Sequence, residues 1–134
     1  AVGLKANWQE LKNLPERRVQ GWRVGRARSM EENVLISHNW DQIRRLMWNY
    51  VGIVRREKRL RLVRRRIDPI LVEIQEHFYD YLLTPDLVEL RNIAVVCELI
   101  IRSASLRKES RGLHYILDYP HHDDINFSGD TVLQ

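Results

Sequence analysis

Apolar residues that recur every three or four positions across residues 39–106 constrain this chain more than any other feature. This spacing places them on one face of a helix. The clearest run follows Thr84, Pro85 and Asp86, which supply an N-cap, a preset first turn and a negative charge at the positive helix end. Its repeated positions are Leu87, Leu90, Ala94, Cys97, Ile101 and Ala104. They predict a helix that packs along an apolar seam and is terminated by Gly112.

Two further helices are predicted ahead of this one. The first begins at Asn39, a candidate cap, and extends to about Arg55. The second spans about Lys58 to Tyr81, and Pro69 within it predicts a kink or break near residues 66–68, because proline removes one backbone hydrogen bond. Its apolar arc comprises Leu60, Val63, Ile67, Ile70, Leu71, Ile74, Phe78 and Tyr81. Three helices joined by short loops predict an all-α fold, a three-helix antiparallel up-down-up bundle.

The predicted bundle occupies only part of the chain. Residues 1–36 hold Pro15 and scattered glycines without a sustained period, which predicts a linker or extended segment. Residues 37–120 form the predicted three-helix domain, closed by a short extended segment that ends at Pro120. Residues 121–134 are polar, which predicts a short, irregular and mobile tail.

The composition predicts a cytoplasmic protein with no membrane partner. No apolar run approaches the ~20 residues that a membrane-spanning helix needs. The single cysteine, Cys97, excludes an internal disulfide and fits a reducing compartment. Because Cys97 occupies a seam position, we expect a buried thiol that packs as a small hydrophobe and does not act as a nucleophile.

A basic run accounts for much of the net charge of +4. Eight of the twelve residues from Arg55 to Arg66 are Lys or Arg. A nucleic-acid site would gather such cations on one surface beside a recognisable groove-reading motif, and no such motif accompanies them. The run therefore favours a solvated helix face, or a surface that meets an acidic domain, and no nucleic-acid partner is expected.

Two other features invite a chemical interpretation. His121, His122, Asp123 and Asp124 are potential metal ligands, but adjacent ligands in a tail rarely close a tetrahedral site, so no metal is expected. Trp40 and Trp48 fit helix packing better than a cofactor cage.

The sequence also lacks a Gly-x-Gly-x-x-Gly loop, a nucleophile elbow and a convincing carboxylate pair. The residues alone therefore predict a helical module without a catalytic site.

Several runs resemble the C-terminal helical domain of the L-aspartate oxidases, a branch of the fumarate reductase and succinate dehydrogenase flavoprotein family. These runs are HNW at 38–40, MWNYVGIVR at 47–55, ELRN at 89–92, KESRGLHY at 108–115 and LDYP at 117–120. The Glu-Ser-Arg-Gly-x-His and Asp-Tyr-Pro elements are shared across the family. The Trp-Asn-Tyr-Val-Gly-Ile-Val-Arg run and the Leu-His-Tyr variant favour the oxidase branch, and the dehydrogenase branch is the alternative.

The resemblance implies a parent enzyme that holds FAD in an upstream flavin domain and oxidises L-aspartate to iminoaspartate for quinolinate and NAD biosynthesis. The family's substrate-binding and FAD-binding residues lie upstream of this domain, so no catalytic, cofactor-binding or metal residue is assigned here. The implied partners are the flavin and capping domains of the same polypeptide, with quinolinate synthase as a further candidate. The predicted interdomain docking residues are Glu109, Ser110, Arg111, Gly112, His114, Asp118 and Tyr119. A stand-alone helical interaction module is a further alternative.

Overall fold

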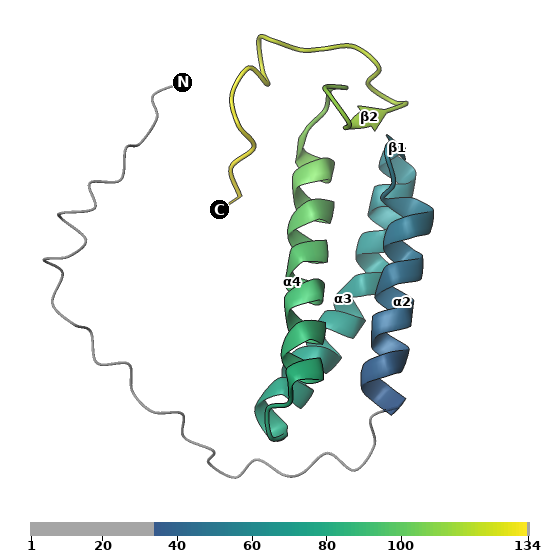
Figure 1. The fold of residues 1–134 in the computed structure, drawn as a ribbon. Coiled ribbons are helices and arrows are strands. Elements are labelled where there is room, and N and C mark those ends of the chain that lie inside the picture. The colour runs from purple at the N-terminus through teal and green to yellow at the C-terminus, as the bar shows by residue number, and fades with distance from the viewer. Residues whose placement is uncertain (1–33, 134) are drawn as a thin grey trace, which may run out of the picture.

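The computed structural model describes residues 34–133, which form a bundle of three helices capped by two short strands. The elements are α2 (Val34–Tyr50), β1 (Val54–Arg55), α3 (Glu57–Asp80), α4 (Pro85–Leu106) and β2 (Tyr115–Ile116). The strands lie at one end of the bundle and the α3–α4 turn lies at the other (Figure 1). The prediction of an all-α bundle is confirmed, with a two-stranded parallel sheet that was not predicted. None of the described helices has the length and hydropathy to cross a membrane.

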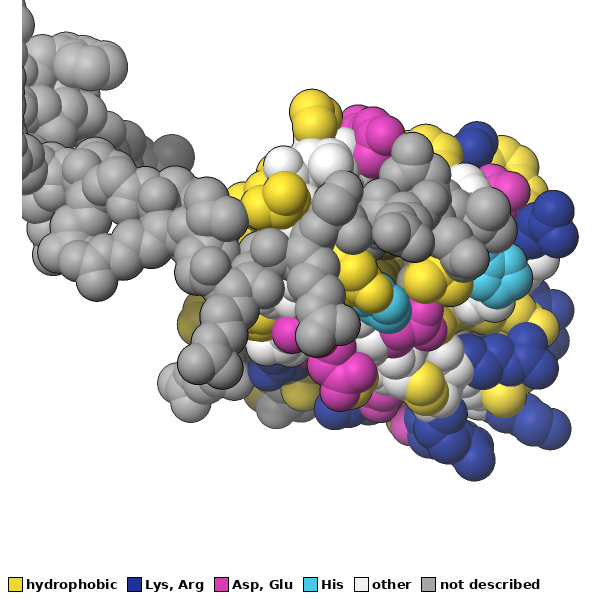
Figure 2. Space-filling view, turned by 90° about the horizontal axis from the view of Figure 1, so that it is seen from below, with side chains coloured by type: hydrophobic (Ala, Val, Ile, Leu, Met, Phe, Trp, Pro, Cys, Tyr) yellow, Lys and Arg dark blue, Asp and Glu magenta, His cyan; other side chains and the backbone are white. Residues whose placement is uncertain are grey.

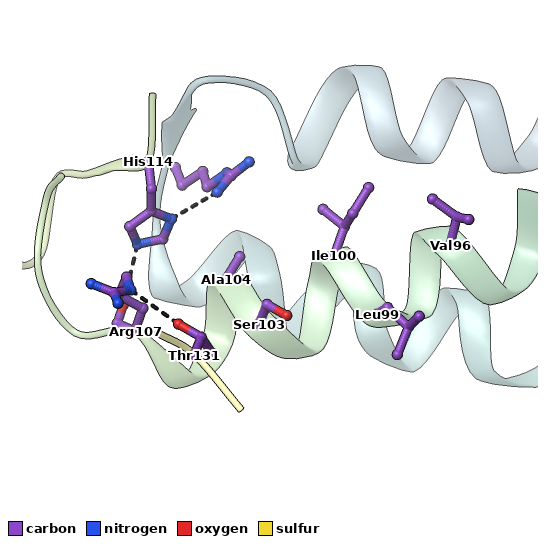
Figure 3. Close-up of a pocket in the computed structure, with 9 residues that line it drawn as sticks. Val96, Leu99, Ile100, Ser103, Ala104, Arg107, His114 and Thr131 are labelled. Carbon is purple, nitrogen blue, oxygen red and sulfur yellow. Dashed lines mark hydrogen bonds between the residues drawn. The ribbon is translucent and has the colours of Figure 1, made fainter. Parts of the chain in front are cut away.

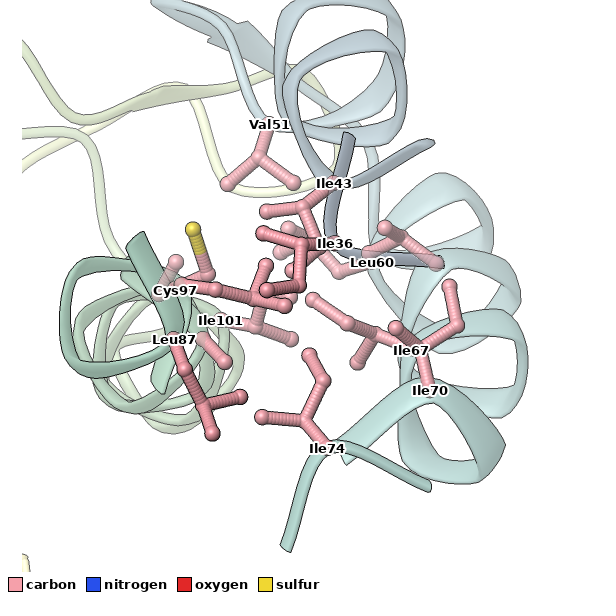
Figure 4. Packing of buried hydrophobic residues seen from close by; sticks show 14 of the residues in the cluster. Ile36, Ile43, Val51, Leu60, Ile67, Ile70, Ile74, Leu87, Cys97 and Ile101 are labelled. Carbon is pink, nitrogen blue, oxygen red and sulfur yellow. The ribbon is translucent and has the colours of Figure 1, made fainter. Parts of the chain in front are cut away.

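The core lies along the axis between the three helices (Figure 4). All six seam positions predicted for the third helix are buried in α4, so Cys97 packs as the predicted buried thiol. Of the predicted α3 arc, five residues are buried and the other three pack against the core. The buried α3 residues are Leu60, Val63, Ile67, Ile70 and Ile74. Each such side chain contributes about 1.5–3 kcal/mol to folding, before the cost of conformational entropy.

The first helix lies several residues nearer the N-terminus than predicted. Residues 34–36, which the sequence assigned to the linker, belong to α2, and the rest of that predicted linker lies outside the described residues. Asn39 is not a cap, because it lies inside α2, where its buried Nδ2 donates to Oε1 of Glu73 at 3.1 Å. The helix ends at Tyr50 because the chain beyond it pairs with β2, where Tyr115 N donates to Ile53 O at 3.3 Å.

Proline does not interrupt the second helix. Of the two predicted outcomes, the break is wrong, since α3 continues through Pro69 to Asp80, and the kink stays a prediction. The hydrogen bond that Pro69 cannot donate would reach the carbonyl of Arg65, and both residues are exposed, so water can bind that carbonyl. Ile67 and Ile70, on either side, are buried and hold the helix against the core.

The third helix begins as predicted and ends earlier. Thr84 is the N-cap, and its Oγ1 accepts a hydrogen bond from the Leu87 N–H at 3.2 Å. The helix ends at Leu106, and Arg107 follows in an extended conformation with φ −79° and ψ 108°. The prediction that Gly112 terminates this helix is therefore wrong. Gly112 instead has φ 59° in a later turn, a conformation that favours glycine.

Candidate functional site

The candidate site is the chain that leaves α4 and closes the sheet end of the bundle, residues 107–121, here called the closing segment. It turns at Arg111–His114 and places β2 beside β1 in parallel register, with Val54 opposite Tyr115. All seven residues predicted for docking lie in this segment. Their contacts therefore show which of these residues are held within this domain and which are accessible to a second domain.

Glu109 is a fully buried carboxylate that gathers the closing segment around it. It accepts hydrogen bonds from Arg107, from Arg111 at 2.8 and 3.0 Å, and from the backbone N–H of Asp123 at 2.8 Å. The hydrogen bonds from Arg111 are the main cause that lowers the pKa of Glu109 to about 2, against the opposing effect of burial. A buried charge of this kind is tolerated because it is paired and hydrogen-bonded.

Ser110 is buried and completes the outer edge of β2. Its Oγ accepts from the Ile116 N–H at 3.0 Å and donates to the Tyr119 carbonyl at 2.8 Å. The Ile116 backbone faces away from β1, so without this hydroxyl a buried N–H would lack a partner. The Ser110 hydroxyl thus provides the hydrogen bond that a third strand would otherwise supply to this edge of β2.

Asp118 and Tyr119 bind the closing segment to the start of α3. The N-cap residue of α3, Arg56, makes no side-chain capping hydrogen bond. Asp118, 61 positions after Glu57, supplies the acceptor instead, because its Oδ2 lies 2.7 Å from the Glu57 backbone nitrogen. Tyr119 donates to the Glu57 carboxylate at 3.2 Å. A carboxylate at a helix N-terminus is favoured by the unpaired N–H groups there.

His114 lies between two arginines. Its Nδ1 is 2.7 Å from Nη1 of Arg55, and its Nε2 is 3.2 Å from the Arg107 carbonyl. Arginine can only donate and the carbonyl can only accept, so this geometry fits a neutral ring protonated at Nε2. Burial, and then the charge of Arg55, lower the pKa of His114.

Arg107 ties the C-terminal residues to the end of α4. Its guanidinium donates to the carbonyls of Phe127 at 3.1 Å and Gly129 at 2.6 Å, and to Oγ1 of Thr131 at 3.0 Å. Arg111 reaches the same part of the chain through an ion pair with Asp124. Residues 121–133 therefore make specific contacts with the bundle, while the predicted mobility of this tail stays untested.

These contacts reduce the number of predicted docking residues that a second domain could touch. The docking prediction itself stays untested. Glu109 and Ser110 are buried and hydrogen-bonded within the domain, so in this conformation they cannot contact a second domain. Gly112 and Asp118 are exposed, and the side chains of Arg111, His114 and Tyr119 are partly exposed. Arg55 and Glu57 were not predicted as members of this network, because their partners His114 and Tyr119 lie 59 and 62 positions away in the sequence.

Beside the closing segment, a groove of about 350 Å³ opens along α4 (Figure 3). Its polar end is formed by Arg55, Arg107 and His114. Its wall is formed by the α4 residues Val96, Leu99, Ile100, Ser103 and Ala104, with Thr131 of the tail at its rim. Val96 is 53% exposed, Leu99 43% and Ile100 39%. Because Leu99 and Ile100 lie three and four positions after Val96, these residues form one apolar strip of α4 that is open to solvent.

The basic run lies on the surface, as predicted. Seven of its eight cations are exposed: Arg56, Lys58, Arg59, Arg61, Arg64, Arg65 and Arg66. The eighth, Arg55, lies outside α3 and is half-buried in β1. Lys and Arg side chains gather along the right-hand edge of the end view in Figure 2. This distribution fits the predicted solvated helix face.

The remaining candidates have ordinary structural contacts. Asp123 accepts from the backbone N–H of Asn126 at 3.0 Å, and residues 34–133 contain no cluster of potential metal ligands. Trp40 packs against the core as predicted. The packing predicted for Trp48 is wrong, because its side chain is 86% exposed, on the side of α2 that faces solvent.

Comparison with known proteins identifies the family of this helical domain and several of its relatives. Residues 40–134 match the family described as fumarate reductase flavoprotein C-term. The chain belongs to this family. As a flavoprotein C-terminal domain it is 52% identical, over 84% of its length, to the L-aspartate oxidase of Pseudomonas aeruginosa. It is 47% identical over 91% of its length to that of Yersinia pestis, and 42% identical over 90% to that of Vibrio cholerae. The flavoprotein C-terminal domain spans about a fifth of these relatives, 20%, 22% and 22% of their lengths.

Proposed function

We propose that this chain is the C-terminal domain of an L-aspartate oxidase, an FAD enzyme that oxidises L-aspartate to iminoaspartate for quinolinate and NAD biosynthesis. The observation that carries the proposal is the 52% identity to the Pseudomonas aeruginosa relative over 84% of this chain. The alternative is the C-terminal domain of a succinate dehydrogenase or fumarate reductase flavoprotein, which the name of the matched family favours. The names of the relatives described above favour the oxidase.

In this proposal the domain supports the enzyme and does not catalyse. FAD would supply the acceptor for two electrons from the substrate. Within residues 34–133, the strands are two residues long and Gly112 lies in a turn between Arg111 and His114. Such elements do not build the strand–loop–helix cradle that binds a dinucleotide pyrophosphate. The described residues therefore do not supply a binding site for the FAD pyrophosphate.

The flavin and capping domains of the same polypeptide are the proposed partners, and quinolinate synthase is a further candidate. Two surfaces are available to them. One is the exposed apolar face of α4, including Val96, Leu99 and Ile100. The other is the accessible part of the predicted docking motif, which leaves out the buried Glu109 and Ser110. A cytoplasmic location accompanies this function.

The proposal also includes an antiparallel up-down-up order of the helices. Short connections support it: residues 51–56 join α2 to α3, and residues 81–84 join α3 to α4. Short loops of this kind usually join antiparallel neighbours. The position of the sheet and of the α3–α4 turn at opposite ends of the bundle agrees with this order (Figure 1).

Flavin reduction in the intact parent protein tests the proposal. The parent would be purified with its flavin and mixed anaerobically with L-aspartate or with succinate, while the flavin absorbance is recorded. Bleaching by L-aspartate alone is the expected result. Bleaching by succinate alone would assign the parent to the dehydrogenase branch. A parent that binds no flavin would overturn both assignments.

A further inference from the structure

Arg55 is a half-buried cation that has no carboxylate partner among residues 34–133. Its Nε donates to the Gly52 carbonyl at 2.9 Å, and its Nη1 donates to Nδ1 of His114 at 2.7 Å. Both acceptors are neutral. Within residues 34–133 no ion pair involves Arg55. Burial lowers the pKa of Arg55, as expected for a cation removed from water without a compensating charge.

The three cations of the closing segment, Arg107, Lys108 and Arg111, already have carboxylate partners. Arg107 and Arg111 share the carboxylate of Glu109, and Lys108 pairs with Glu57 at 3.1 Å. Arg107 also uses its remaining donors on the tail. Arg55 differs from them, because Nη2 of its guanidinium has no described partner.

The groove beside Arg55 has the chemistry to bind a carboxylate that is attached to, or flanked by, an apolar group. Arg55 lies at the polar end, and Val96, Leu99 and Ile100 form the wall along α4. These three side chains are about two-fifths to one-half exposed, so apolar area is available for burial. A partner that covers the wall would also desolvate Arg55 further, which makes an opposite charge at that point more important.

We propose that Arg55 pairs with a carboxylate carried by the domain that packs over α4, an aspartate or glutamate flanked by apolar side chains. The inference rests on the proposed function, which supplies that domain. The chain covers 20% of the Pseudomonas aeruginosa relative, so most of such a parent lies outside the described residues. The contact combines apolar burial with one directional ion pair, which fixes the position of the helix on its partner.

Small probes test the groove on the 134-residue chain itself. Hexanoate carries both features of the proposed contact, acetate carries only the charge, and 1-hexanol carries mainly the apolar body. The Nε–H signal of Arg55 would be followed by NMR during titration with each probe. Hexanoate should bind in the millimolar range and shift this signal, and acetate and hexanol should each bind about fivefold more weakly or worse. Equal binding of all three, or no shift at Arg55, would overturn the proposal.

Three variants identify the groups that bind hexanoate. Arg55→Met keeps an apolar stem and removes the charge, so hexanoate should then bind no better than hexanol, read from α4 amide signals. Ile100→Ala shortens the wall while Arg55 stays in place, so the advantage of hexanoate over acetate should shrink. Arg59→Met, on the exposed face of α3, is the matched control and should change nothing. A loss in the control equal to that in Arg55→Met would show only general attraction to a basic protein.

Hydrogen exchange in the intact parent protein tests whether a second domain docks over the groove through Arg55. Hydrogen exchange across residues 95–103 of α4 should be faster in the Arg55→Met parent than in the wild-type or Arg59→Met parent, because docking over the groove is weakened. If the parent oxidises L-aspartate but exchange is the same in all three, the Arg55 inference fails while the proposed function stands. If exchange depends on Arg55 but L-aspartate does not reduce the flavin, the docking inference stands and the enzyme assignment fails.

Discussion

Arg111 holds the buried carboxylate of Glu109 at two points, with Nε 2.8 Å from Oε1 and Nη2 3.0 Å from Oε2. This paired geometry requires the planar guanidinium, which lysine cannot reproduce. The contact holds the closing segment in the shape that brings β2 to β1. It therefore links the family-typical Glu-Ser-Arg-Gly run to the stability of this domain.

We expect Arg111→Lys to lower the melting temperature by roughly 5 °C or more, although it conserves charge. The physical reason is that one ammonium cannot replace both of the guanidinium's hydrogen bonds to a carboxylate that has no access to water. Thermal unfolding followed by circular dichroism would measure the change. Arg59→Lys on exposed α3 is the matched control and should melt within about 1 °C of the wild type. Equal melting temperatures for the two variants would contradict the role assigned to Arg111.

Acid should destabilise the domain through Glu109. The pKa of this carboxyl is about 2 in the folded protein and near 4.5 as the ordinary value. Because the folded value is depressed, its stabilising contribution is complete above pH 4.5 and is lost as the pH falls from about 4.5 to about 2. Urea unfolding at several pH values in this window should show a steeper loss for the wild type than for Glu109→Gln. Parallel curves would mean that other carboxyls carry the acid sensitivity.

A second pH dependence should occur at milder acidity, through His114. Burial and the neighbouring Arg55 lower its pKa below the ordinary 6.5. A folded base with a depressed pKa contributes fully above the unfolded value, so stability should fall as the pH drops below 6.5. NMR titration of the His114 ring should give a midpoint below 6.5. Arg55→Met should move that midpoint upward, and a midpoint that does not respond would sink the assigned Arg55–His114 contact.

The cap of α4 offers a local test of the bundle. Thr84→Ala removes the Oγ1 that accepts from the Leu87 N–H, so it should lower the free energy of unfolding by about 1 kcal/mol. Thr84→Ser retains the acceptor and should recover most of the loss. The two variants can be compared by urea unfolding at neutral pH. A serine variant as unstable as the alanine variant would show that the Thr84 methyl group, not its hydroxyl, contributes the stability.

Helical periodicity predicted the core well, and local chemistry was less reliable at the helix ends. The α4 seam and its Thr84 cap were predicted because both depend on residues three or four positions apart. The start of α2 was missed because Asn39, a good capping residue by type, is instead held by Glu73 from another helix. The break predicted at Pro69 was wrong, since its exposed position makes the missing hydrogen bond less costly.

The candidate site was predicted as a segment but not as a network. The run from Glu109 to Tyr119 stood out by its charges and its resemblance to a family, yet its partners were not apparent. Asp118 caps a helix 61 positions earlier in the chain, and Arg55 meets His114 across 59 positions. Sequence patterns carry no information about such pairs, because they depend on which helix ends the packing brings together.

The sequence by itself determined that this chain forms helices, which faces of α3 and α4 are buried, and which family its motifs resemble. These properties follow from residue spacing and residue type, which act locally. Only the tertiary structure decided that β1 and β2 pair, that Glu109 and Ser110 are buried, and that Arg55 lies at a groove where no carboxylate of the described part of the chain reaches it. Those outcomes depend on long-range packing, which sets the solvent exposure and the electrostatic neighbours of each side chain.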